Sequence, residues 1–306
     1  MALLRRTFSA IILLGGAALI MFTLPSLVGV AILFLMAVAG LLEFYSILRA
    51  ANIPAFRILG TAAGVILLAA TYLSLNIQFF ARERPTEIWK ELPLLVLTLI
   101  IFAIFLRQFP QKKNPQPLPT IACTMLGLVY VPFLIMFFFF LAFRWTPVAP
   151  MSTMSPTAVW LLLYLVVVVK SSDVGAYFVG SLIGRHKLFP RISPGKTWEG
   201  LAGGLATGIL SSVLFSRLAH ATGTDPGTVT FGKLVLETSD IWILGAFLAV
   251  IGVLGDLVES LLKRSAGMKD SGRLFPGMGG ILDVLDSLLF AAPALYFYLR
   301  WFAHVV

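Results

Sequence analysis

Residues 252–286 read GVLGDLVESLLKRSAGMKDSGRLFPGMGGILDVLD and join two long apolar runs through a charged, glycine-rich segment. From Ser260 to Asp286 this segment holds three acids and four bases, while the apolar runs on either side are long enough to span a bilayer. A bilayer helix tolerates an acid only where a cavity, a metal or a partner charge compensates it. The stretch therefore predicts a membrane protein with a reaction centre for an anionic substrate at one membrane edge.

The composition places the rest of the chain in a membrane as well. Of the 306 residues, 59% are hydrophobic and 12% are charged, and the mean hydropathy is +0.95, which lies outside the balance of a soluble domain. The single cysteine, Cys123, lies in an apolar run, where a buried structural role is expected. One cysteine excludes a disulfide within the chain and a zinc site built from cysteines.

The apolar runs predict an all-α integral membrane protein of about nine transmembrane helices with a cytoplasmic N-terminus. These runs are 8–24, 26–48, 57–79, 93–106, 120–143, 157–181, 199–216, 241–262 and 281–303. The first run follows Arg5 and Arg6 as a signal peptide would, but it lacks an Ala-x-Ala-like cleavage site and leads directly into another span, so we expect a retained helix. We divide the chain into N-terminal transmembrane helices, 1–118, and a transmembrane catalytic region with motif loops at the cytoplasmic edge, 119–306.

The distribution of lysine and arginine indicates the orientation of the spans. With nine spans and a cytoplasmic N-terminus, 16 of the 23 basic residues fall on the cytoplasmic side and seven on the other. The segments around Asp173, at 185–200 and at 256–286 then all lie at the cytoplasmic edge of an inner (plasma) membrane. The net charge of +9 is therefore an orientation signal and an attraction for phosphate. No nucleic-acid partner is expected, because no soluble basic face exists to bind one.

The first of these segments carries Asp173 and Tyr177, four residues apart and so on one helix face. Small residues around them would let another helix approach closely. An ion pair that serves packing is the structural alternative, but an acid within the membrane more often has a function.

The second segment, 184–200, is a basic, hydroxyl-rich loop that runs into a helix whose first turn carries Thr197 and Glu199. Its Gly-Lys-Thr triplet is not a P-loop, because Pro190 occupies the first glycine position and no strand is expected before it. Free N–H groups at a helix start, beside Lys196, form a good site for phosphate oxygens. A basic loop that only sets topology is the alternative, and His186 is expected to be solvated or to cap the helix.

The third segment carries acids on two helices. Its first helix presents a polar stripe of Asp256, Glu259, Ser260 and Lys263, and its second helix presents Asp283 and Asp286 on one face. Carboxylate oxygens are the ligands that Mg²⁺ prefers when it bridges substrate phosphates. A structural ion-pair network that also includes Arg264 is the alternative, and it suits Glu259 best.

These motifs resemble those of the phosphatidate cytidylyltransferases, the CDP-diacylglycerol synthases. The similarity covers about residues 171–290 and includes the Ser-Pro-x-Lys-Thr-x-Glu-Gly element at 193–200 and the Ser-x-x-Lys-Arg-x₄-Lys-Asp-x-Gly spacing at 260–272. Two positions depart from the family pattern: Met278 stands where the family usually has His, and Val284 where it usually has Arg. The N-terminal half matches only as a set of hydrophobic spans.

The resemblance implies a role for each matching residue. The implied catalytic residues are Asp256, Asp283, Lys263 and Arg264. The implied metal ligands are Asp256, Asp283, Glu259 and Asp286. The implied substrate-binding residues are Asp173, Tyr177, Ser193, Lys196, Thr197, Glu199, Ser260, Lys269, Asp270, Gly279 and Gly280.

By the same resemblance, the protein is a homodimer that joins CTP to phosphatidate in the membrane, giving CDP-diacylglycerol and pyrophosphate. Mg²⁺ is the implied cofactor, with room for a second, monovalent cation such as K⁺. A CTP-dependent polyprenol or phytol kinase would share the charged loops but release CDP. A transporter would also bury charges, yet it should show inverted repeats and polar residues near the midplane. Here most acids cluster on one side, and the main exception, Glu43, is expected near the cytoplasmic end of the second span.

Overall fold

The computed structural model describes residues 23–80, 87–110, 114–220, 228–268, 271–272 and 279–305. Within these residues, eight helices are long and apolar enough to cross a membrane, and they follow the last eight predicted runs in order. The first predicted run, 8–24, lies almost wholly outside the described residues, so the count of nine stays a prediction. The expectation of an all-α membrane protein is confirmed.

The helices divide into an N-terminal and a C-terminal set. The first set is α2 (Ser26–Ala50), α3 (Arg57–Asn76) with the short η1 (Ile77–Phe79), η2 (Glu87–Glu91) leading into α4 (Leu92–Gln108), and α5 (Pro117–Leu128) continued through the π-helical turn η3 (Val129–Phe133) into α6 (Leu134–Phe143). The second set is α7 (Pro156–Ile183), α8 (Trp198–His220), α9 (Thr238–Ser265) and α10 (Ile281–Phe302).

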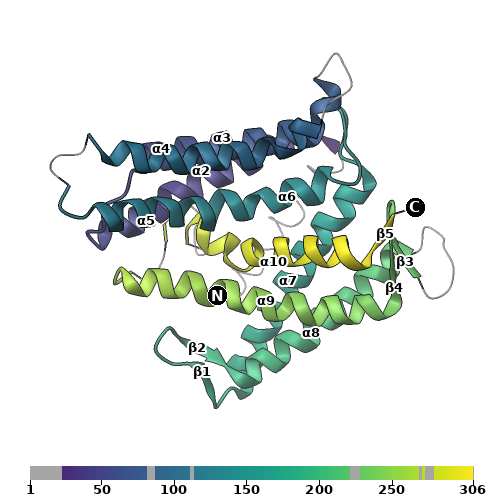
Figure 1. Cartoon of the computed structure of the whole chain (residues 1–306). Coiled ribbons are helices and arrows are strands. Elements are labelled where there is room, and N and C mark those ends of the chain that lie inside the picture. Colours follow the sequence, from purple (N-terminus) through teal and green to yellow (C-terminus); the bar gives the residue numbers. More distant parts are fainter. Residues whose placement is uncertain are drawn as a thin grey trace.

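Helix α10 lies at the centre of the bundle. Figure 1 shows α2, α3 and α4 on one side and α7, α8 and α9 on the other, with α6 and α10 between them. Helix α10 packs against α9, α6, α7 and α2. Residues at the start of α10 can therefore contact both halves of the chain.

A β-hairpin replaces the loop expected between α7 and α8. Strands β1 (Lys187–Phe189) and β2 (Ser193–Thr197) pair antiparallel, with Lys187 opposite Thr197 and Phe189 opposite Ser193. The expectation that no strand precedes the Gly-Lys-Thr triplet is therefore wrong. The triplet itself lies on β2, so it does not form the loop between a strand and a helix that a P-loop requires. Strand pairing gives hydrogen-bond partners to backbone N–H and C=O groups, which an unpaired extended connection would not provide.

A second small sheet lies at the opposite end of the bundle (Figure 1). Strand β4 (Leu234–Glu237) pairs with β3 (Thr228–Phe231) on one side and with β5 (His304–Val305) on the other, all antiparallel. The turn between β3 and β4 uses Gly232 at φ +64°, where a Cβ would lie 2.2 Å from Thr157 Oγ1. These strands were not predicted from the sequence, and the alternating Val229 and Phe231, buried in the core, are the signal of a strand.

Helices α7 and α8 approach each other through glycines, as the small residues near Asp173 predict. A Cβ on Gly175 of α7 would lie 2.0 Å from Thr207 Oγ1 of α8, and one on Gly203 of α8 would lie 2.4 Å from Val179 Cγ2 of α7. Thr207 Oγ1 also donates to the Ser171 carbonyl at 3.2 Å. This close contact fixes α7, which carries Asp173, against α8.

Candidate active site

A cavity of about 400 Å³ opens between α7, the β1–β2 hairpin, α8, α9 and α10. It brings together all three segments that the sequence singles out, although whole helices separate them along the chain. Eight predicted site residues line it: Asp173, Tyr177, Ser193, Lys196, Thr197, Asp256, Asp283 and Asp286.

The hairpin is tied to α9 across this cavity. Lys196 Nζ lies 2.8 Å from Asp256 Oδ2 and donates to the Val253 carbonyl at 3.1 Å. The neighbouring Thr197 is buried, and its Oγ1 accepts a hydrogen bond from Gly200 N at 3.1 Å, which caps the start of α8. Thr197 thus anchors the strand while Lys196 points its charge into the site.

Three carboxylates meet where α9 faces α10. Asp256, Glu259 and Asp286 each place an oxygen within 4.8 Å of the other two. The helices come this close because α9 has Gly255 at the contact, where a Cβ would lie 2.4 Å from the Asp286 carbonyl oxygen. Ser260 does not line the cavity, and its Oγ donates to Asp256 Oδ1 at 3.4 Å.

Lys170 of α7 also lines the cavity. In the sequence it was one of the 16 basic residues that indicate the orientation of the spans, and it was not predicted as a site residue. Its Nζ donates to Ser287 Oγ at 2.8 Å and to Asp173 Oδ2 at 3.3 Å, and lies 3.7 Å from Asp286 Oδ1. Ser287 Oγ in turn lies 3.1 Å from Asp173 Oδ2. Lys170 therefore links the Asp of the first segment to an Asp of the third.

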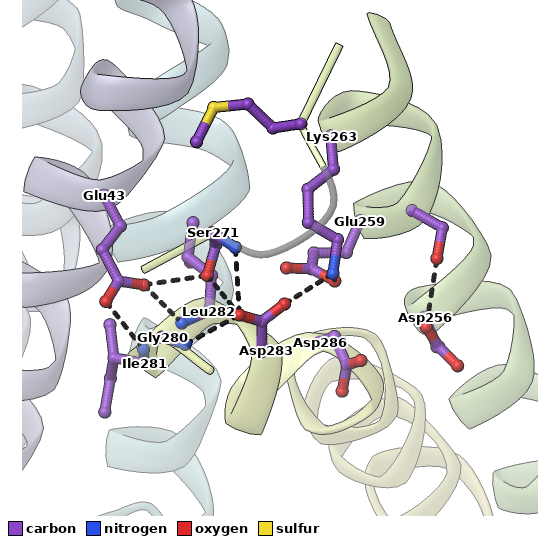
Figure 2. Close-up of polar contacts among 12 residues, drawn as sticks. Glu43, Asp256, Glu259, Lys263, Ser271, Gly280, Ile281, Leu282, Asp283 and Asp286 are labelled. Atoms are coloured by element: carbon purple, nitrogen blue, oxygen red, sulfur yellow. Dashed lines mark hydrogen bonds and ion pairs between the residues drawn. The ribbon is translucent and has the colours of Figure 1, made fainter. Parts of the chain in front are cut away.

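Lys263 lies between an acid of its own helix and an acid of α10. Its Nζ is 2.5 Å from Glu259 Oε2 and 2.5 Å from Asp283 Oδ1, as Figure 2 shows. The side chains of Lys263 and Asp283 are each 11% exposed and that of Glu259 is 1% exposed. The ion-pair network weighed for Glu259 and Lys263 is thus present, and it extends to a second helix.

Asp283 is held from both sides at the start of α10. While Oδ1 faces Lys263, Oδ2 accepts hydrogen bonds from Gly280 N at 2.7 Å and from Ser271 N at 3.0 Å, and lies 2.8 Å from Ser271 Oγ. Gly279 adopts φ +91°, and a Cβ there would lie 2.3 Å from Asp283 Oδ2. The predicted glycines, Gly279 and Gly280, therefore let the backbone close around this carboxylate.

Glu43 of α2 reaches the same place from the N-terminal half. Its Oε1 accepts from Ile281 N, and its Oε2 accepts from Leu282 N, both at 2.9 Å (Figure 2). Glu43 had been noted only as an acid away from the cluster. Both Glu43 and Lys170 had one signal in the sequence, a charge inside an apolar run.

Other predicted residues lie outside the cavity. Glu199 accepts from His186 N at 3.2 Å and contacts His186 Nδ1 at 2.6 Å, so this pair closes the base of the hairpin. Arg264 is exposed and donates to the Met268 carbonyl at 3.3 Å. Tyr177, by contrast, lines the cavity and is 53% exposed. Lys269, Asp270 and Met278 lie outside the described residues, so their roles stay predictions.

The described residues fit a divalent cation. Five carboxylates (Asp173, Asp256, Glu259, Asp283, Asp286) and three lysines (Lys170, Lys196, Lys263) form one connected group with a formal charge of −2. Within the described part of the chain, the buried Glu259 Oε1 has neither a hydrogen-bond partner nor an ion-pair partner. A buried carboxylate oxygen is costly without one. Asp256, Glu259 and Asp286 are therefore the ligands that such an ion would find closest together.

Comparisons with known proteins found a family model and relatives that match this chain. The model of the cytidylyltransferase family matches residues 4–302. The chain is 32% identical over 294 residues to the phosphatidate cytidylyltransferase of Bacillus subtilis, covering 95% of this chain and 97% of that protein. It is 43% identical over 140 residues to the enzyme of that name from Haemophilus influenzae and 45% identical over 139 residues to that from Mycobacterium bovis. These two matches cover 45% and 44% of this chain and 46% and 39% of the relatives.

Proposed function

We propose that this chain, which belongs to the cytidylyltransferase family, is a phosphatidate cytidylyltransferase: CTP and phosphatidate give CDP-diacylglycerol and pyrophosphate. The family and the 32% identity to the Bacillus subtilis protein over nearly its whole length support the reaction. The single observation that carries the assignment to a site is the cavity itself, in which carboxylates of membrane-spanning helices lie beside Lys170 of α7 and Lys196 of the hairpin. A lipid phosphate and a nucleotide triphosphate can meet there without leaving the membrane edge.

The reaction needs no nucleophile from the protein. A phosphate oxygen of phosphatidate attacks the α-phosphorus of CTP, a new P–O bond forms, and the bond to the leaving pyrophosphate breaks with its electron pair. A phosphate monoester has a second pKa near 6 and is largely dianionic at pH 7, so no proton has to be removed from it. The protein therefore contributes positioning and neutralisation of charge.

The lysines divide this work. Lys196 lies on the hairpin at the cavity wall, where its ammonium would contact phosphate oxygens. Lys263 is buried between Glu259 and Asp283 and holds the two helices in register. Lys170 holds Asp173 and Asp286 in the same way from α7.

We assign the divalent cation to Asp256, Glu259 and Asp286, with Asp283 beside them, and expect it to be Mg²⁺. When bound, Mg²⁺ supplies charge neutralisation on the triphosphate. The carboxylates would hold that ion in place, and the three lysines offset the repulsion among the carboxylates. A second, monovalent cation such as K⁺ stays a prediction.

An assay of the purified protein tests this function. With CTP, Mg²⁺ and phosphatidate together, we expect pyrophosphate and CDP-diacylglycerol in equal amounts, and no pyrophosphate when phosphatidate is omitted or replaced by diacylglycerol. Formation of CDP with a polyprenol or phytol acceptor would assign the chain to the lipid kinases instead. Absence of turnover with every acceptor would contradict both.

The active site is proposed to face the cytoplasm. The hairpin and the start of α10 lie at one end of the bundle and η2 at the other, as the split of basic residues predicts (Figure 1). In a Cys123→Ala background, we expect Lys90→Cys, but not Lys187→Cys, to react with an impermeant thiol reagent on intact cells. Permeabilised cells provide the control, in which both positions react. Labelling of Lys187→Cys alone in intact cells would reverse the orientation.

The predicted homodimer is also a proposal. The mass of the purified protein in detergent, corrected for bound detergent, distinguishes one copy from two.

A further inference from the structure

The N-terminal half of the chain contributes one charged side chain to the catalytic end of α10. Glu43 comes from α2, more than 200 residues away in the sequence, and its carboxylate accepts hydrogen bonds from Ile281 N and Leu282 N, both at 2.9 Å. These N–H groups belong to the first turn of α10, where a helix has no internal acceptors for them. A carboxylate is also favoured there by the helix dipole.

The contact reaches Asp283 through one residue. Ser271 Oγ lies 3.1 Å from Glu43 Oε2 and 2.8 Å from Asp283 Oδ2 (Figure 2). The chain of contacts then continues from Asp283 Oδ1 to Lys263 Nζ. Glu43 is thus connected through a single hydroxyl group to the network of acids and lysines, but it does not line the cavity.

The local backbone leaves room for this carboxylate. A Cβ on Gly272 would lie 2.5 Å from Glu43 Oε1, and a Cβ on Gly280 would lie 2.3 Å from Glu43 Oε2. Within the described residues Glu43 has no ion pair with lysine, arginine or histidine, so backbone and hydroxyl donors hold its charge. Hydrogen bonds to a carboxylate are stronger than those to a neutral acceptor, so Glu43 holds these donors in place.

We infer that Glu43 is a positioning residue for the proposed cytidylyl transfer: it orients the first turn of α10 and so sets the place of Asp283. This inference rests on the proposed function, because its kinetic readout is that reaction. Displacement of a reacting or binding group by about 1 Å costs about 100-fold in rate. The loss is expected in kcat, because Glu43 touches α10 and not the cavity.

Glu43→Gln tests this inference. The amide keeps the size of the side chain but replaces one acceptor with a donor, which then faces an N–H group of α10. We expect kcat to fall about 10- to 100-fold, with the KM for CTP changed less than about threefold. Hydrogen exchange of peptides covering Ile281 and Leu282 should become at least about tenfold faster, because their amides lose a charged acceptor.

Asp240→Asn is the matched control. Asp240 also accepts hydrogen bonds from a backbone N–H at the start of a helix, Glu237 N at 3.0 Å, and from a hydroxyl, Tyr298 Oη at 2.8 Å. It lies in the first turn of α9, at the end of that helix away from the cavity. We expect this variant to keep wild-type kcat and wild-type exchange at 281 and 282. A general loss of helix capping would instead affect both variants alike.

Gly272→Ala provides a second route that leaves Glu43 intact. The added methyl group displaces the Glu43 carboxylate, so we expect the kinetics and exchange of Glu43→Gln. The double variant, Glu43→Gln with Gly272→Ala, should lose no more kcat than the more impaired single variant, because both changes break the same contact of the Glu43 carboxylate. Gly272→Ala alone, compared with wild type, tests the inference if Glu43→Gln does not fold.

The outcomes are separable. Wild-type kcat in Glu43→Gln, or a reduced kcat with unchanged exchange at 281 and 282, would overturn the positioning role. Fully additive losses in the double variant would overturn it too. If the wild-type chain itself makes no CDP-diacylglycerol, the proposed function fails, and hydrogen exchange still shows whether Glu43 holds α10.

Discussion

Asp256→Asn is expected to reduce kcat at least about 1,000-fold while leaving a folded, extractable protein. Asp256 faces the cavity, contacts Lys196 Nζ at 2.8 Å, and lies with Glu259 and Asp286 in the group of acids closest to one another. Loss of a metal ligand removes several kcal/mol of stabilisation from the charged transition state, and each 1.4 kcal/mol is a factor of ten in rate. The change conserves volume, and the side chain is 34% exposed, so stability should change little.

Pyrophosphate release under saturating Mg²⁺, together with thermal unfolding in detergent, measures these two effects. Asp240→Asn in the same helix controls for the loss of a carboxylate from α9. Activity above about a tenth of wild type would contradict the role of Asp256 as a metal ligand. A protein that cannot be extracted would point to packing instead.

The sequence was sufficient to predict the eight spans that the structure describes and the segments that meet in the cavity. Apolar runs identify transmembrane helices because a run of about 20 apolar residues matches the thickness of the bilayer core. The spacing of Asp256, Glu259 and Lys263 placed them on one helix face, and the structure keeps them there. Eight predicted site residues line one cavity.

What the sequence could not supply were contacts between distant segments. Glu43 binds backbone N–H groups of α10, and a backbone donor leaves no trace in a sequence. Lys170 follows four valines, and its partner Ser287 lies 117 residues further on. Both could have been suspected as charges in apolar runs, but their partners are decided by how the helices pack.

The short strands were missed for a different reason. Strand β3 alternates polar and apolar residues, whereas β4 reads Leu-Val-Leu-Glu and does not. The hairpin around the two-residue turn Gly232-Lys233 is only ten residues long and stands between two long spans, so its signal in the sequence is weak. The β1–β2 hairpin has no such alternation, and its form follows from the closely packed ends of α7 and α8. Helix length is encoded in composition, whereas these strands depend on their surroundings.

Lys263→Met is expected to lower both stability and turnover. Lys263 Nζ lies 2.5 Å from Glu259 Oε2 and 2.5 Å from Asp283 Oδ1, and none of the three side chains is more than 11% exposed. Removing one member of a buried ion pair leaves an uncompensated charge and costs about 3–5 kcal/mol. For a chain of this size we expect a decrease of about 10 °C in Tm, measured in detergent, and kcat below about a hundredth of wild type. Arg264→Met controls the stability measurement, because Arg264 is exposed and, among the described residues, its side chain makes one hydrogen bond, to the Met268 carbonyl.

A second substitution separates the two effects. Glu259 is the most deeply buried acid of this group, with a side chain 1% exposed, and Lys263 is its ion-pair partner, whereas Asp283 keeps hydrogen bonds from Gly280 N and Ser271 N. The double variant Glu259→Gln with Lys263→Met should therefore recover at least half of the lost Tm, because replacing a buried pair by neutral side chains of similar volume is often neutral. Turnover should not recover, since both a proposed metal ligand and the lysine that positions Asp283 are gone. If the double variant unfolds at the same temperature as Lys263→Met alone, the buried charge of Glu259 is not the source of the instability. If it recovers turnover, neither side chain takes part in the reaction.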